Sequence, residues 1–380
     1  MSWIIPENRL GPEPRIIIDG NLKQNICIKG IAGTGKTLVL MHLVRKVMHI
    51  EPNIRICVLA YNNLIVEHYR MGFDELCMRV NVMTYYSFTK SSQNYDYIFC
   101  DNIQNISSKT LVQISSQSKY VIVTIDPYIK LFATDPLTNE LTLSICEIIS
   151  LLTPKVYDLF THNYCSSKRI LISKVLRINL YQGINSISKI DTQVRICKAK
   201  NDVEELQYIY RYAKRGLKVG NSSSVLLPTH DLIMSFIQSV ILLEGKQPWT
   251  IQTNKYGKTD YSVLNCYLEK NGLPIQCLGN GYGHLSECQN KISISTYYSS
   301  LGLQFDDVYI PYVNSNMYIN SDEQISRNAL ALAMTRCRYS LYITYTGKIH
   351  EYLKDAEADC CIIDIHEALS SNSASIFKGF

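Results

Sequence analysis

The feature of this sequence that most constrains its fold is an octapeptide near the beginning of the chain. It reads Gly30-Ile31-Ala32-Gly33-Thr34-Gly35-Lys36-Thr37, a complete G-x-x-x-x-G-K-T pattern. An apolar run at 26–28 precedes it and a helix-like stretch at 37–48 follows it, which is the context of a phosphate-binding loop. Glycines in such a loop let backbone N–H groups close around phosphates, and the start of the helix adds its dipole. We therefore expect ATP here, with Lys36 on the β- and γ-phosphates and the Thr37 hydroxyl on Mg²⁺.

The acid that such a loop needs for its magnesium ion is expected at Asp101. A P-loop site uses a carboxylate at the end of a neighbouring strand, and the apolar run at 97–100 ends in this residue. The alternative is an ordinary aspartate in the turn after a strand. Because the octapeptide is present, we predict that Asp101 and Thr37 hold Mg²⁺ together.

Short apolar runs alternate with helix-length amphipathic stretches, a pattern that predicts an α/β fold with parallel sheets. Strands are expected at 26–28, 54–60, 97–100, 121–124, 194–197, 224–227, 292–295, 308–311 and 341–344. Helices are expected at 37–48, 64–71, 202–215, 231–244, 261–271 and 322–335. A less regular stretch around Pro154 separates two series of elements. We therefore predict an N-terminal ATP-binding domain at 1–155 and a C-terminal domain at 156–380.

Three local patterns add detail to this outline. Asp202 and Glu205 have the spacing of a capping box at the start of a helix, and Gly272 stands where a glycine often ends one. The tetrapeptide Thr-Tyr-Tyr-Ser occurs twice, at 84–87 and at 296–299, each time after a strand-like run. The repeat suggests equivalent loops in two related domains.

Composition narrows the class of protein without naming a function. Hydrophobic residues make up 46% and charged residues 19% of the chain, so we expect it to fold throughout. The net charge of +5 permits a nucleic-acid partner without requiring one. The 13 cysteines form no C-x-x-C pair, which argues against a zinc site and for a reducing compartment. The longest apolar stretch, 232–243, is too short and too polar for a membrane span, and no secretory signal is recognisable, so we expect a cytoplasmic protein.

Seven short segments after the octapeptide resemble, in order, the motifs of superfamily 1 helicases of the UvrD/Rep group, and the resemblance extends over nearly the whole chain. They are LAYN at 59–62; VMTYYSF at 82–88, similar to TxHSF; DNIQ at 101–104, similar to DEAQ; IDP at 125–127, similar to GDPxQ; NYCSS at 163–167, similar to NYRSS; STYYSSLGLQF at 295–305, similar to STxHSAKGLEF; and AMTRCR at 333–338, similar to ALTRAR. The ordered set is far more specific than any one of its members.

The resemblance implies two tandem RecA-like P-loop domains that close on ATP and Mg²⁺. It implies that Asp101 serves catalysis, that Gln104 couples the nucleotide to motion, and that Arg336 is an arginine finger from the second lobe. It places Asp126 and Gln304 at the nucleotide. It also implies a groove for single-stranded nucleic acid, DNA in preference to RNA, lined by Tyr61, Asn62, Thr84, Tyr86, Thr296 and Tyr298. The alternatives are local packing of the groove residues at strand ends and a surface role for the arginine.

Several positions depart from the motifs of the group. Asn102 replaces the glutamate that deprotonates the attacking water, and an amide cannot take that proton at neutral pH. Ile129 replaces a glutamine, Cys165 an arginine, Leu301 a lysine and Gln304 a glutamate. The large accessory subdomains of the group are also missing. We therefore expect nucleotide binding to be retained better than hydrolysis, and duplex unwinding by the chain alone to be absent.

Two functions remain open from the sequence. The first is an ATP-dependent helicase-like protein that acts on single-stranded nucleic acid with weak hydrolysis, as a subunit of a larger DNA-processing or defence assembly with a protein partner. The second is an ATP-gated scaffold that positions an effector such as a nuclease, because a ligand that favours one conformation can shift an equilibrium without being consumed. A structural P-loop relic is disfavoured, since Lys36, Thr37, Asp101 and Arg336 are all present.

Overall fold

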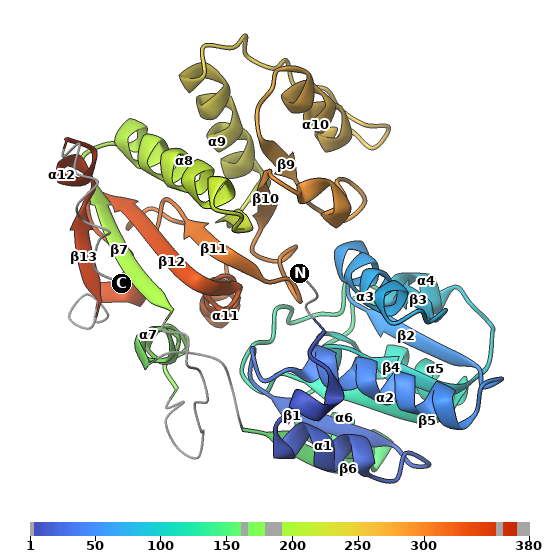
Figure 1. The fold of residues 1–380 in the computed structure, drawn as a ribbon. Coiled ribbons are helices and arrows are strands. Elements are labelled where there is room, and N and C mark those ends of the chain that lie inside the picture. Colours follow the sequence, from blue (N-terminus) through green and yellow to red (C-terminus); the bar gives the residue numbers. More distant parts are fainter. Residues whose placement is uncertain (1–3, 161–165, 179–191, 355–359, 371–380) are drawn as a thin grey trace.

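The computed structural model describes residues 4–160, 166–178, 192–354 and 360–370. It contains two α/β lobes, each built on one parallel sheet with helices on both faces (Figure 1). Strands covered on both faces are expected to be apolar along their whole length, and all five residues of Ile56–Ala60 in the first sheet are buried. The predicted fold class, two RecA-like α/β domains with parallel sheets, is confirmed.

The first sheet has the strand order β3-β2-β4-β5-β1-β6, and every neighbouring pair is parallel. Its strands are β1 (Ile26–Gly30), β2 (Ile56–Ala60), β3 (Asn81–Thr84), β4 (Tyr95–Cys100), β5 (Ser118–Ile125) and β6 (Lys155–Leu159). The octapeptide follows β1 and Asp101 follows β4. We expected β1 and β4 to be direct neighbours, but β5 lies between them. β5 therefore adds its own polar groups to the site.

Helices cover both faces of this first sheet. They are η1 (Glu7–Arg9), α1 (Pro12–Asp19), α2 (Lys36–Ile50), α3 (Asn63–Glu75), α4 (Tyr85–Thr89), η2 (Ile103–Asn105), α5 (Ser108–Ser116) and α6 (Ile145–Leu152). Side chains of α1, α2 and α3 fill one apolar core, and those of α4, α5 and α6 fill the core on the other face.

The second sheet has the order β13-β7-β12-β11-β8-β10-β9 and is also parallel throughout. Its strands are β7 (Gln193–Ala199), β8 (Ser223–Leu227), β9 (Ile275–Cys277), β10 (Ile292–Thr296), β11 (Phe305–Ile310), β12 (Cys337–Thr346) and β13 (Cys361–Asp364). Its helices are α7 (Ser166–Leu176), α8 (Asp202–Lys218), α9 (His230–Leu243), α10 (Tyr261–Lys270), η3 (Leu285–Cys288), α11 (Glu323–Thr335) and α12 (Ile365–Ser370).

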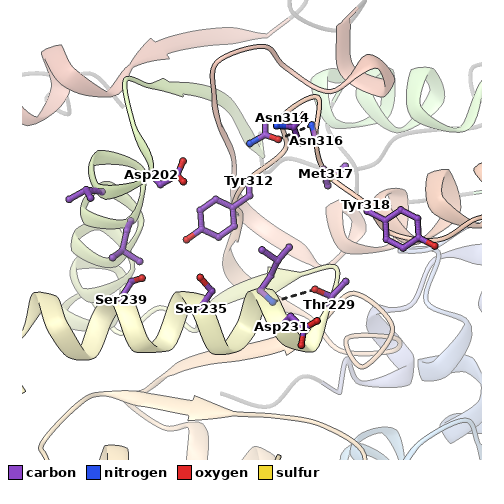
Figure 2. Close-up of a pocket in the computed structure, with 13 residues that line it drawn as sticks. Asp202, Thr229, Asp231, Ser235, Ser239, Tyr312, Asn314, Asn316, Met317 and Tyr318 are labelled. Carbon is purple, nitrogen blue, oxygen red and sulfur yellow. Dashed lines mark hydrogen bonds between the residues drawn. The ribbon is translucent and has the colours of Figure 1, made fainter. Parts of the chain in front are cut away.

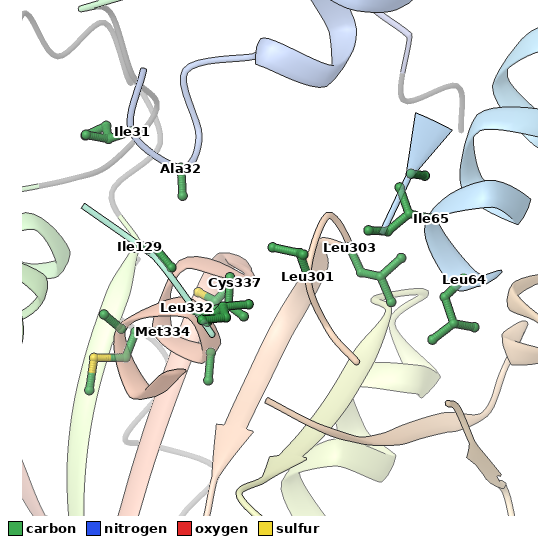
Figure 3. Close-up of a cluster of buried hydrophobic side chains, with 14 of the residues drawn as sticks. Ile31, Ala32, Leu64, Ile65, Ile129, Leu301, Leu303, Leu332, Met334 and Cys337 are labelled. Carbon is green, nitrogen blue, oxygen red and sulfur yellow. The ribbon is translucent and has the colours of Figure 1, made fainter. Parts of the chain in front are cut away.

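The two faces of the second sheet have different neighbours. On one face, α7 and α11 share a continuous apolar core with the first lobe, and on the other, α8, α9 and α10 form a separate core. Figure 3 shows the joining region, where Leu301 and Leu303 of the second lobe lie between Ile65 of α3 and Leu332 of α11. The lobes therefore meet through apolar side chains at the edge of the cleft.

Most of the predicted elements are present, and the exceptions have physical causes. β3, β6, β9 and β13 were not among the expected strands. All four lie at the edges of their sheets, and β9 has only three residues, so their apolar signal is weak. The domain boundary at 155/156 stays a prediction; the structure places Lys155–Leu159 in the first sheet, beside β1. Among the described residues, no helix is long and apolar enough to cross a membrane.

The predicted capping box at the start of α8 is wrong by one residue. Asn201 caps the helix, because its side chain accepts a hydrogen bond from the Glu204 backbone at 2.9 Å. Glu205 instead points into the lobe and is fully buried. The prediction for Gly272 is confirmed: it follows α10 with φ +69°, and its N–H donates to the Glu269 carbonyl at 3.0 Å.

Candidate functional site

The octapeptide forms a tight loop between β1 and α2. Gly35 has φ +85° and stands directly before the helix, a backbone conformation that favours glycine. The Lys36 amine donates to the carbonyls of Gly30 at 2.7 Å and Ile31 at 2.9 Å, and it lies 3.9 Å from a carboxylate oxygen of Asp126. Burial lowers the pKa of Lys36, while the nearby carboxylates oppose this shift. The lysine thus lies folded over its own loop, where a phosphate would offer stronger acceptors than two carbonyls.

Asp101 is the centre of a buried hydrogen-bond cluster. Its Oδ2 accepts from the hydroxyls of Thr37 and Tyr69, each at 3.0 Å, and its Oδ1 accepts from Thr124 of β5. Adjacent oxygen ligands of octahedral Mg²⁺, each about 2.1 Å from the ion, lie about 3.0 Å apart. The Thr37 and Asp101 oxygens have this separation, so the pair fits the two protein ligands of a nucleotide-bound Mg²⁺.

A cavity of about 190 Å³ opens beside this loop, between the two lobes. The first lobe contributes the loop, Gln104 and Asp126, and the second contributes Gln304 and Arg336. The structure therefore brings together, around one cavity, most of the residues predicted for the nucleotide. Further lining residues that the sequence analysis did not assign to the site include Ile5, His68, Leu332 and Arg338.

The missed residues change the character of the cavity. Ile5 and Leu332 give it apolar walls, on which a nucleobase can pack. Burial, with a smaller contribution from Arg338, lowers the pKa of His68 to about 4, so this imidazole is neutral at physiological pH. Only spatial proximity to the loop marks these side chains, and it cannot be read from their sequence context.

Arg336 enters the cavity from the end of α11. Its guanidinium donates to the carbonyls of Leu332 at 3.1 Å and Leu303 at 3.0 Å and to the Thr335 hydroxyl at 2.7 Å. It is 6% exposed, so the alternative of a surface helix arginine does not describe it. Gln304, on the same rim, accepts from Arg338 at 3.3 Å. Whether Arg336 reaches a γ-phosphate stays a prediction.

Gln104 joins the ends of β4 and β5. Its amide donates to the Ile129 carbonyl at 3.1 Å and accepts from the Asp126 backbone at 3.3 Å. Asp126 in turn accepts from the backbones of Tyr128 and Ile129. A movement at either strand end would therefore be transmitted through this amide, which is compatible with the coupling role that the resemblance implies.

Asn102 lies on the cavity wall in a left-handed backbone conformation, with φ +55°. Asn is among the few residues that adopt this region readily. Asp126 is the single carboxylate among the described residues that line the cavity, and its oxygens are engaged by two backbone N–H groups and approached by Lys36. The lining therefore offers no free carboxylate to serve as a general base. Cys165, which replaces an arginine of the group, lies outside the described residues.

The two Thr-Tyr-Tyr-Ser segments begin with the same hydrogen bond, after which residues 85–89 form α4 whereas residues 297–302 form turns. Thr84 ends β3, and its hydroxyl accepts from the Ser87 backbone at 3.1 Å; Thr296 ends β10 and accepts from the Ser299 backbone at the same distance. Both threonines are nearly buried. The repeat thus marks equivalent hydrogen bonds at the carboxyl ends of strands in the two lobes, and both hydroxyls are engaged in them.

The other predicted groove residues occupy varied positions. The Asn62 side chain caps α3 by accepting from Ile65, and Tyr86 is 56% exposed with Lys90 over its ring. Tyr61, Phe132 and Tyr298 form a row of aromatic rings across the lobe boundary, with centroid distances of 5.2 Å and 5.6 Å. Phe132 was not predicted, because its only signal is its position beside rings that are distant in sequence.

The second lobe has a larger cavity, of about 560 Å³, at the carboxyl ends of β7, β8 and β11 (Figure 2). Asp202 and Asp231 lie on its wall, together with hydroxyl groups such as those of Ser235 and Tyr312. Among the described residues that line it, none is a lysine, arginine or histidine. Two carboxylates without a cation would repel phosphates, so this larger cavity does not suit a nucleotide.

Comparisons with known proteins give one family match and several similar structures. Residues 10–129 match the family model of the type III restriction enzyme res subunit. Among solved structures, the PRRSV helicase is similar with a TM-score of 0.43 and 11% identity over 87% of this chain and 54% of that chain. The helicase nonstructural protein 10 of an arterivirus, in complex with DNA, has a TM-score of 0.43 and 12% identity over 87% of this chain and 62% of that one.

This chain thus spans about three-fifths or less of the length of those helicases. No curated protein sequence matches it significantly. The matched segment at 10–129 contains the octapeptide, Asp101 and Asp126, which are the first-lobe half of the cavity. In its fold, the chain is an α/β protein of two RecA-like lobes with a phosphate-binding loop in the first, and residues 10–129 are similar to the res subunit family.

Proposed function

We propose that this protein binds Mg-ATP between its lobes and hydrolyses it weakly, as a UvrD/Rep-like subunit of a larger DNA-processing or defence assembly that contains a protein partner. The observation that carries the proposal is the contrast within one cavity. The groups for binding are present, namely Lys36, the Thr37–Asp101 pair and Arg336. The group for proton transfer is missing, because Asn102 occupies the wall where a carboxylate would be needed.

Single-stranded nucleic acid, DNA in preference to RNA, is the proposed second ligand. The row of Tyr61, Phe132 and Tyr298 supports this, because successive bases stack on such rings with little sequence preference. The row spans the lobe boundary, so a strand lying on it would sense a change in the distance between the lobes. ATP would act on the strand through that distance.

A second candidate is the ATP-gated scaffold, and one observation favours it. The loop of Leu301, Gly302 and Leu303 packs against α3 of the other lobe, where the helicase group has a charged residue instead of Leu301. An apolar contact of this kind stabilises the closed arrangement of the lobes by burial. In this function, closure positions a partner effector and turnover is not required.

Nucleotide binding and turnover measured on the same purified protein test the proposal. Titration with a slowly hydrolysed ATP analogue and Mg²⁺ should give saturable binding that Lys36→Ala abolishes. Steady-state ATP hydrolysis should stay slow with and without single-stranded DNA or RNA. Robust turnover by the chain alone would refute weak hydrolysis, and absence of binding in the unmodified protein would refute the nucleotide site itself.

The same protein separates the two candidates. If the Asp101→Asn variant binds nucleotide and still engages its partner or strand, binding alone is sufficient and the scaffold is favoured. If Asp101→Asn loses the response to ATP while retaining binding, turnover matters. Thermal unfolding in ATP against ADP adds a check on Arg336: a larger shift with ATP is expected from a γ-phosphate contact, and equal shifts would contradict it.

A further inference from the structure

The helices α8 and α9 lie on the face of the second sheet opposite to α7 and α11 (Figure 1). Side chains of these two helices line a basic groove. We call it the α8–α9 groove. The residues that line it are Gln207, Tyr210, Arg211, Lys214, Arg215, Lys218, Leu243 and Glu244. The cavity between the lobes and the aromatic row belong to the other face, so this groove is separate from the proposed ATP and strand sites.

The charges of this groove are concentrated on one stripe of α8. Arg211 lies three residues before Lys214 and four before Arg215, and Lys218 lies four residues after Lys214 and three after Arg215, which places the four side by side on the helix. Like charges at these spacings destabilise a helix, whereas a face meant only for solvent can alternate the signs of its charges. Arg215 and Lys218 lie in the last turn of α8, where the helix dipole favours cations, but the repulsion among the four side chains would be relieved by a ligand of opposite charge.

Little within the protein neutralises this stripe. Glu244 is the one carboxylate among the described residues that line the groove, and it forms an ion pair with Lys214 at 2.9 Å. Arg211, Arg215 and Lys218 are exposed and form no ion pair with any residue that the structure describes. Three cations thus remain available to an anionic ligand.

The aromatic rings beside the stripe are not available to bases. The Lys214 amine lies 4.8 Å from the centre of the Tyr210 ring, and the Arg215 guanidinium lies 5.3 Å from that of Tyr212. Each ring holds its cation in place, and the cation covers one face of the ring. A ligand here would meet positive charge rather than stacking surfaces, which suits the backbone of a duplex better than the bases of a single strand.

The length of the stripe matches such a backbone. Seven residues separate Arg211 from Lys218, a rise of about 10 Å along a helix, and one strand of duplex DNA presents a phosphate about every 3.4 Å along its axis. We propose that the α8–α9 groove binds the phosphate backbone of duplex nucleic acid, independently of sequence and of ATP. The site goes beyond the proposed strand-binding function and would hold a duplex region outside the cleft.

Anisotropy titration of a fluorescent 20-base-pair DNA duplex at several salt concentrations tests the groove. The variant is Arg211→Gln/Arg215→Gln/Lys218→Gln, which keeps good helix formers at each position. The matched control is Lys109→Gln/Lys119→Gln/Lys155→Gln, which removes the same charge from three exposed positions of the first lobe. Thermal unfolding establishes that both variants are folded.

The groove variant should bind the duplex about 10- to 100-fold more weakly at low salt. The slope of log affinity against log salt should fall by about 2.7, because each phosphate that the protein no longer neutralises lowers it by about 0.9. The control should change affinity by less than about threefold. Equal losses in both variants, or no loss in the groove variant, would overturn the proposal.

The Lys36→Ala variant separates the groove from the nucleotide site. It should bind the duplex normally, so failure of the nucleotide site and failure of the groove give different results. Loss of duplex binding in Lys36→Ala would overturn the independence from ATP.

Discussion

Replacing Glu205 by glutamine is expected to remove a pH dependence of stability that this one buried carboxyl group imposes. Glu205 lies on α8 with no exposed surface. Its Oε1 accepts from the Tyr312 backbone at 2.7 Å and from the Thr344 hydroxyl, while Oε2 has no hydrogen-bond partner among the described residues. Burial raises the pKa of Glu205 from 4.5 to about 7, although both hydrogen bonds oppose the shift.

The magnitude follows from this shift. A raised folded-state pKa means that the folded protein keeps a proton which the unfolded chain releases above pH 4.5, so stability falls as the pH rises from 4.5 to 7. At about 1.36 kcal/mol per pKa unit, the loss is about 3 kcal/mol. Glutamine has nearly the same shape and cannot ionise. The difference in unfolding free energy between the natural protein and Glu205→Gln should therefore change by about 3 kcal/mol between pH 4 and pH 8, in favour of the variant at pH 8.

Urea unfolding at a series of pH values and constant salt measures this difference. Glu204→Gln is the matched control on the same helix: hydrogen bonds from His366 and from the Lys200 backbone lower the pKa of Glu204, so its pH dependence should have the opposite sign. A difference curve for Glu205→Gln that is flat across this range would refute the reasoning, because it would show that the carboxyl is hydrated or ionised at no cost in the folded state.

Three further outcomes are expected. Asn102→Glu should raise steady-state ATP hydrolysis about 10²- to 10⁴-fold, the usual worth of a general base, and an increase below tenfold would show that another missing group limits turnover. Gly302→Ala should destabilise the closed lobes more than Gly281→Ala does: both positions have positive φ, but only at Gly302 would the added methyl meet another side chain, 3.1 Å from Ile65. Phe132→Ala should weaken single-stranded DNA binding by about 1–3 kcal/mol in a fluorescence titration while ATP binding is unchanged.

The features that were predictable from sequence are those encoded by local patterns. The octapeptide, the alternation of strands and helices and the turn glycine Gly272 each depend on residues within a few positions of one another. The repeated Thr-Tyr-Tyr-Ser segment likewise makes the same hydrogen bond twice, because it needs only a threonine hydroxyl and the backbone N–H three residues later. Local backbone preferences and hydrogen bonds determine such features wherever they occur.

Predictions failed where a local pattern competed with packing. Asp202 and Glu205 have the spacing of a capping box, yet the packing of α8 buries Glu205, and the neighbouring Asn201 caps the helix. The four edge strands, β3, β6, β9 and β13, were missed because an edge strand needs fewer apolar residues than a central one.

In the candidate site, too, some features follow from local sequence and others from packing. From the sequence alone, the phosphate-binding loop and the acid at the end of a strand are recognisable, because a strand–loop–helix unit creates its own anion site. The tertiary structure alone decides that β5 stands between that loop and Asp101, that Phe132 joins rings from two other loops, and that the cations of α8 face a groove without a free carboxylate. These features depend on contacts between residues far apart in the chain, and such contacts are set by how sheets and helices pack rather than by any short run of residues.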